Sequence, residues 1–122
     1  MFKRFLFIGL AVLSGAGAFA QIEDEGNTVE FRIAAGTRGA PWNTKDQMVR
    51  VALGDTLRVL NDDAVAHQLH TNGAPCGHGD RINPGQSWDC RISRTFDPMS
   101  SGPLYDHGYG PSAEFWVTTV AE

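Results

Sequence analysis

The chain has 122 residues, of which 42% are hydrophobic and 20% charged, and its formal net charge at pH 7 is −4. The acidic balance disfavours nucleic acid and anionic lipid as partners, because both are negatively charged. The length is that of one domain with a core large enough to fold.

The first twenty residues are typical of a secretory signal peptide. Lys3 and Arg4 precede an apolar run from Phe5 to Leu13, and Ala18-Phe19-Ala20 matches the pattern that a signal peptidase accepts. The apolar run is shorter than the roughly 20 residues that span a bilayer. An uncleaved N-terminal anchor is the competing interpretation.

Cleavage after residue 20 would leave a mature chain of residues 21–122, with an acidic, featureless tail over 21–27. We expect this chain to be periplasmic or secreted, to form a single domain and to carry no membrane segment. Two of the ten basic residues and none of the fourteen acidic ones fall in the signal, so the mature domain is more acidic than the whole chain.

Period-two alternation predicts the first strands of the domain. Val29, Phe31 and Ile33 alternate with polar residues, which is the pattern of a half-buried strand. The alternation returns over 49–53 and again over 57–59, with Gly54-Asp55 between them. These two segments and their turn predict a β-hairpin.

The second half of the chain continues with short strands separated by glycine- and proline-rich loops. The expected strands lie at 66–71, 88–92, 104–107 and 113–120, and Trp88 and Phe115 are the strongest core candidates. No segment shows a helical period with caps. Short strands at this spacing predict an all-β sandwich or barrel.

From Met48 onward the order of motifs resembles the cupredoxin family. Residues 51–59 look like that family's Gly-Asp hairpin, and Asn61 to His67 is similar to its Asn-rich loop, which ends in the first copper ligand. Asn83-Pro84-Gly85 looks like the turn before a later strand. The resemblance implies a Greek-key β-sandwich, cupredoxin-like, with copper as its cofactor.

The sequence departs from the family in the loop that should supply the remaining ligands. A blue-copper centre needs two imidazoles, one thiolate and a weak axial ligand. Here the loop reads Tyr105-Asp106-His107-Gly108 and contains no cysteine. Depending on how the aromatic residue is aligned, either Asp106 or His107 stands at the thiolate position. Either alignment implies a harder, non-blue copper site.

The resemblance and the histidine positions together give a predicted ligand set of His67, His107, Asp106 and His78. His78 lies in a glycine-flanked loop that could fold back over the site. His67 and His70 are three residues apart, so in a strand they point to opposite faces. His70 is therefore left out of the predicted set. Met99, in a preceding loop, is a candidate axial ligand or lid residue.

The two cysteines, Cys76 and Cys90, are expected to form a disulfide, because the compartment of an exported protein is oxidising. The alternative is that Cys76, in the sequence Cys76-Gly77-His78, is a soft metal ligand.

These features lead to one main functional hypothesis and two others. The first is an exported copper-binding protein, not an enzyme, for copper handling or for redox coupling and electron transfer to an unknown periplasmic protein. The alternative is a metal-free binding or adaptor module, in which Asp106 and His107 form a hydrogen-bonded pair. A small mononuclear copper enzyme is a minor third hypothesis, since no nucleophile–base pair is evident.

Overall fold

The computed structural model describes residues 26–121, so the expected signal peptide at 1–20 and most of the predicted tail at 21–27 lie outside the described residues. Nearly all of its regular structure is strand. The elements are β1 (Thr28–Ile33), the 3-10 turn η3 (Lys45–Gln47), β2 (Val49–Ala52), β3 (Thr56–Asn61), β4 (Leu69–His70), β5 (Ser87–Arg91), α1 (Pro98–Ser101), β6 (Leu104–Asp106), β7 (Gly110–Phe115) and β8 (Val117–Val120). Over residues 26–121, no helix has the length and apolar character needed to cross a membrane.

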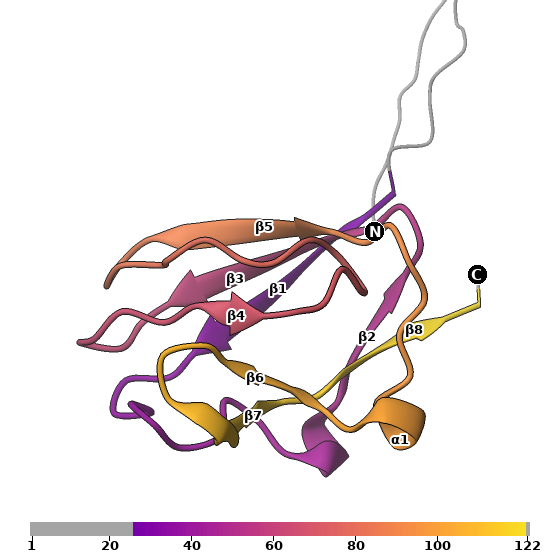
Figure 1. Ribbon diagram of the computed structural model, residues 1–122. Helices are drawn as coiled ribbons and strands as arrows, with labels where there is room; N and C mark the ends of the chain where they lie inside the picture. Colours follow the sequence, from indigo (N-terminus) through magenta and orange to yellow (C-terminus); the bar gives the residue numbers. More distant parts are fainter. Residues whose placement is uncertain (1–25, 122) are drawn as a thin grey trace, which may run out of the picture.

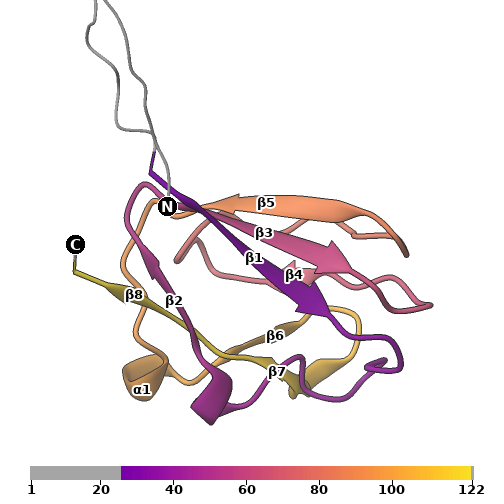
Figure 2. The same cartoon turned by 180° about the vertical axis from the view of Figure 1, so that it is seen from behind.

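The strands form two facing layers. One layer is a sheet of order β1-β3-β5, in which β1 and β3 run parallel and β5 is antiparallel to β3. Opposite it lie the antiparallel sheet β4-β6-β7 and the parallel pair β2-β8 (Figure 1, Figure 2). The expected all-β sandwich is therefore confirmed.

The core fills the space between the layers. Leu57 and Val59 of β3 point inward, and Phe115 at the end of β7 is fully buried. The ring of Phe115 packs against Phe31 and Trp42, at centroid distances of 4.9 and 5.2 Å. Phe115 is thus the core residue that the sequence predicts, whereas Trp88 is only partly buried at the edge of the same cluster.

The predicted hairpin over 49–59 is wrong. The turn at Gly54-Asp55 is present, but β2 pairs with β8 while β3 pairs with β1 and β5. The Asp55 carboxylate accepts hydrogen bonds from the backbone N–H groups of Ala52 (2.9 Å) and Asn27 (3.1 Å), which makes the turn a corner between sheets. Alternation shows that each strand has a buried face and does not specify its neighbours.

The predicted closing strand is also divided, at Trp116, between two sheets. Residues before it form β7 on β6, and residues after it form β8 on β2. The side chain of Asn43 holds the break by hydrogen-bonding both the N–H and the C=O of Trp116. One continuous apolar segment thus serves two sheets.

The disulfide between Cys76 and Cys90 is present, with Cα atoms 5.6 Å apart. Both residues are almost completely buried. Cys90 lies in β5, so the bond ties the long loop between β4 and β5 to the first sheet. The alternative role of Cys76 as a metal ligand is incompatible with this bond.

Replacing both cysteines by alanine should lower the free energy of unfolding by about 3 kcal/mol, because the bond restricts the unfolded chain. Urea denaturation at pH 7 measures this difference. A reducing agent should have the same effect on the wild-type protein and none on the variant. A loss below about 1 kcal/mol would contradict the expectation.

Candidate metal centre

Three histidines from separate segments converge at the surface of the sandwich. His70 ends β4, His78 lies in the loop that follows, and His107 comes directly after β6. Nδ1 of His70 is 3.1 Å from Nε2 of His78 and 3.4 Å from Nδ1 of His107. One ring nitrogen of each lies within 4.8 Å of the others, which is the arrangement of a candidate metal site.

The antiparallel pairing of β4 and β6 brings His70 and His107 together. His70 is the register partner of Tyr105, and their rings stack with centroids 4.8 Å apart and an interplanar angle of 21°. One step further along, the backbone N–H of His107 donates to the carbonyl of Gln68 at 2.7 Å. The strand ladder therefore fixes the positions of two of the three histidines.

Backbone contacts to β4 hold the third histidine. Gly79 follows His78, and its N–H donates to the carbonyl of Leu69 at 3.0 Å. A Cβ at Gly79 would lie 2.9 Å from that carbonyl oxygen, so this close approach requires glycine. The Gly79 carbonyl lies 3.1 Å from His78 Nδ1. A proton on Nδ1 would be donated there, which leaves the Nε2 lone pair facing His70.

The nitrogen separations fit the geometry of a bound transition metal. Two nitrogens, each about 2.0 Å from an ion at a tetrahedral angle, lie about 3.3 Å apart. The separations of 3.1 and 3.4 Å around His70 agree with that value. Burial, followed by the nearby charges of His78 and His107, lowers the pKa of His70. This ring therefore favours the neutral form that binds metals.

His67 belongs to a different, buried network. Its Nδ1 lies 2.5 Å from Oδ2 of Asp106 and its Nε2 lies 2.8 Å from Oδ2 of Asp63. The three side chains are between 0 and 3% exposed. Each ring nitrogen thus faces a carboxylate oxygen, and neither is directed at the histidine cluster.

The buried carboxylate of Asp63 is held ionised by its hydrogen bonds. Burial alone would raise its pKa, but the backbone N–H of Arg38, the His67 ring and the N–H groups of Gly36 and Ala64 outweigh burial and lower the pKa. The Arg38 and Gly36 bonds are 2.6 and 2.8 Å long. Asp63 therefore anchors the loop after β1 as well as His67.

The structure divides the predicted ligand set in two. His78 and His107 lie in the surface cluster, whereas His67 and Asp106 bond to each other in the interior. The alternation argument is confirmed, because His67 and His70 do face opposite ways. The same argument could have found His70, which the predicted set lacks. His70 follows His67 by an odd number of residues, and the same holds for His107 and Asp106. In an extended chain, both histidines therefore point away from the buried pair.

Met99 is the other candidate ligand. It lies in α1, before the start of β6, and so at the opposite end of that strand from His107. Met99 is 60% exposed, and its backbone N–H donates to the Asp97 side chain that caps the helix, at 2.9 Å.

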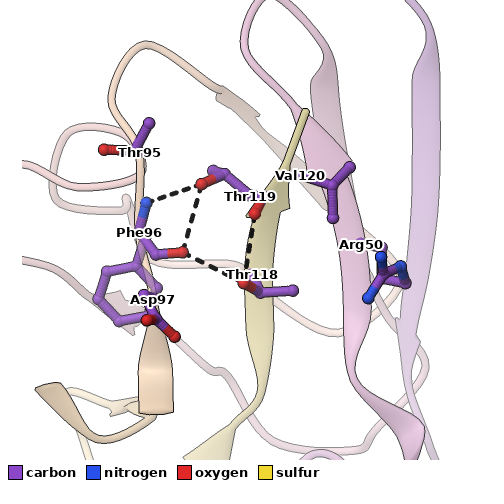
Figure 3. Close-up of a pocket in the computed structure, with 7 residues that line it drawn as sticks. All are labelled: Arg50, Thr95, Phe96, Asp97, Thr118, Thr119 and Val120. Atoms are coloured by element: carbon purple, nitrogen blue, oxygen red, sulfur yellow. Dashed lines mark hydrogen bonds between the residues drawn. The ribbon is translucent and has the colours of Figure 1, made fainter. Parts of the chain in front are cut away.

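A pocket of about 420 Å³ lies between β8 and the segment that leads into α1 (Figure 3). Several of its polar groups bond to one another: Phe96 N–H donates to Thr119 Oγ1 at 2.9 Å, and Phe96 C=O accepts from Thr118 and Thr119. It shares no residue with the histidine cluster. The lining residues are Arg50, Thr95, Phe96, Asp97, Thr118, Thr119 and Val120.

Comparison with known proteins gives matches at the level of structure. No protein-family model and no curated protein matches the sequence. The purple cupredoxin from Nitrosopumilus maritimus matches with a TM-score of 0.52 and 18% identity, over 75% of this chain and 99% of that one. Two methionine-to-alanine variants of amicyanin in the Cu(I) form match with TM-scores of 0.52 and identities of 18 and 17%, over 82% of this chain and 87% of theirs.

The chain has a cupredoxin-like fold. At these identities the likeness establishes the fold, and the expected resemblance is confirmed at that level. In this cupredoxin-like sandwich, His67, which the sequence resemblance predicts to be the first copper ligand, is bonded to two aspartates. The three clustered histidines lie at the surface, at the end of β4 and in the loops that follow β4 and β6.

Replacing Asp63 by asparagine should destabilise the fold by about 3 kcal/mol at pH 7, since it breaks a buried carboxylate–imidazole contact. Because folding lowers the pKa of Asp63, its stabilising effect is fully present above the unfolded value of about 4 and is lost progressively as the pH falls from there through the lower folded value. The difference in the free energy of unfolding between Asp63→Asn and the wild type should therefore be smaller at pH 3 than at pH 7.

Urea denaturation at pH 7 and pH 3 measures this difference. The matched control is Asp62→Asn, which removes an exposed partner of Arg32 and should cost less than about 1 kcal/mol at either pH. Equal losses in the two variants would contradict the role given to Asp63.

Proposed function

We propose that this protein is an exported, cupredoxin-like copper protein that binds the metal through His70, His78 and His107. The observation that carries the proposal is the convergence of three imidazole nitrogens from separate segments. Export is supported by the signal-like sequence of residues 1–20. Its role would be in copper handling or in redox coupling to a partner protein.

The donor set favours copper among the transition metals. Imidazole suits copper, zinc and nickel, and Cu(II) stands highest in the order of divalent affinities. The lowered pKa of His70 reduces competition from protons at one of the three ligands. The amicyanin structures that share the fold are described as Cu(I) forms, which supports copper as the metal to test first.

The proposed centre has no thiolate. The chain contains two cysteines, and both sulfurs are joined in the disulfide. Because the intense colour of blue-copper proteins comes from a short Cu–thiolate bond, the copper-loaded protein should lack that absorption. The proposed site is therefore a non-blue one, as expected from the sequence.

The exposure of the site supports copper handling in particular. His78 and His107 are both exposed, and His70 is partly exposed. A donor group of another protein could reach an ion held there, and ligand exchange at a surface site is a direct route for metal transfer. An outer-sphere electron carrier instead benefits from a shielded ion with fixed ligands.

Titration of residues 21–122 with Cu(II), followed by EPR, tests the proposal. We expect one equivalent of protein-bound, non-blue copper with nitrogen ligation. Replacing His70, His78 or His107 singly by glutamine should weaken binding tenfold or more, because each change removes one of three nitrogen donors.

Two control variants accompany the titration. Met99→Ala should leave the affinity and the spectrum unchanged, because Met99 lies outside the histidine cluster. Arg81→Gln alters an exposed residue in the His78 loop without removing a cluster nitrogen, and it should also bind normally. An absence of protein-bound copper in the wild type would contradict the proposal and favour the metal-free adaptor hypothesis.

A further inference from the structure

The histidine centre is joined to the buried network through one residue, Asp106. Its carboxylate Oδ1 accepts the backbone N–H of Gly108 at 2.8 Å, and its carbonyl accepts the N–H of Tyr109 at 3.2 Å. These two bonds close a tight turn with His107 at its second position. An aspartate that bonds to the N–H two residues ahead is a recognised way of fixing such turns.

The carboxylate of Asp106 is itself held on its other oxygen. Oδ2 contacts Nδ1 of His67 at 2.5 Å and accepts the indole N–H of Trp42 at 3.3 Å. The side chain is 1% exposed. Since Oδ2 is bonded to two buried side chains, the carboxylate has little freedom to rotate, and the turn that its Oδ1 closes at Gly108 is equally constrained.

The constraint extends inward from His67. Its second nitrogen bonds to Asp63, whose carboxylate accepts from the loop after β1. The backbone N–H and C=O of His67 both pair with Ile82, at 3.0 and 2.7 Å. Ile82 lies in the same loop as His78. The network thus contacts the segments on either side of the centre that carry His78 and His107.

We propose that Asp106 is a positioning residue for the histidine centre, and that its carboxylate, locked by His67, holds the turn that presents His107 to His70. Asp106 does not contact the ion in this scheme. The expected effect of Asp106 on metal affinity rests on the proposed function, whereas its role in placing His107 beside His70 does not. Groups that orient a metal ligand commonly change affinity by about 10- to 100-fold.

Three variants at Asp106 test the inference. Asp106→Ala removes both oxygens, so we expect copper affinity to fall about tenfold or more in a protein that remains folded by circular dichroism. Asp106→Asn keeps an oxygen for the Gly108 N–H and should recover most of the affinity. If Asp106→Ala does not fold, Asp106→Leu, whose side chain has the same branching and the same number of heavy atoms, is measured against the same criteria.

A metal-free measurement separates this inference from the proposed function. The rings of His70 and His107 have centroids 5.6 Å apart, close enough for a proton–proton contact in NMR spectra of the wild type. We expect that contact to be lost in Asp106→Ala, or in Asp106→Leu where that variant is used, and kept in Asp106→Asn. It remains a test of positioning even if the wild type binds no copper.

Asp89→Asn is the matched control, since Asp89 is an exposed carboxylate on β5 that pairs with Arg58. It should preserve both the ring contact and the affinity. The inference is overturned if a folded Asp106→Ala or Asp106→Leu keeps the His70–His107 contact. It is also overturned if the wild type binds copper and the copper affinity of that variant is within twofold of the wild-type affinity.

Discussion

The arrangement of the surrounding loops depends on the hydrogen bonds of one buried side chain, His67. Its imidazole bonds to Asp63 on one side and to Asp106 on the other. Burying ionisable groups costs several kcal/mol for each charge unless their hydrogen bonds are satisfied. Here every carboxylate oxygen has a partner. The partners are backbone N–H groups at 36, 38, 64 and 108, the Trp42 indole and the His67 ring itself.

This buried network and the surface cluster are built from neighbouring residues. His67 and His70 occupy one segment, and Asp106 and His107 are adjacent in another. Because successive side chains of an extended chain alternate in direction, each segment can serve the interior and the surface at once. The same antiparallel pairing of β4 and β6 therefore aligns the inner contact between His67 and Asp106 and the outer contact between His70 and His107.

Sulfur has a structural role in this chain. Cys76 lies two residues before His78, and its disulfide to Cys90 ties that loop to β5. In the proposed copper protein the disulfide would thus shape the loop that carries His78, while the proposed ligands are nitrogens. If the site binds copper as proposed, its exposed nitrogen ligands would suit metal exchange at the surface better than the shielded electron transfer to which a thiolate-bound copper is suited.

The sequence by itself predicted most of the strands and the all-β class from alternation and turn residues, which are local features. The order of its motifs predicted the cupredoxin-like fold, and the number of cysteines predicted the Cys76–Cys90 bond. The sequence also placed His67 and His70 on opposite faces. It did not determine that β2 and β3 join different sheets, or that His67 bonds to Asp63 and Asp106. Only the tertiary structure decided which face carries the histidine cluster, since that depends on side chains far apart in the chain meeting across strands.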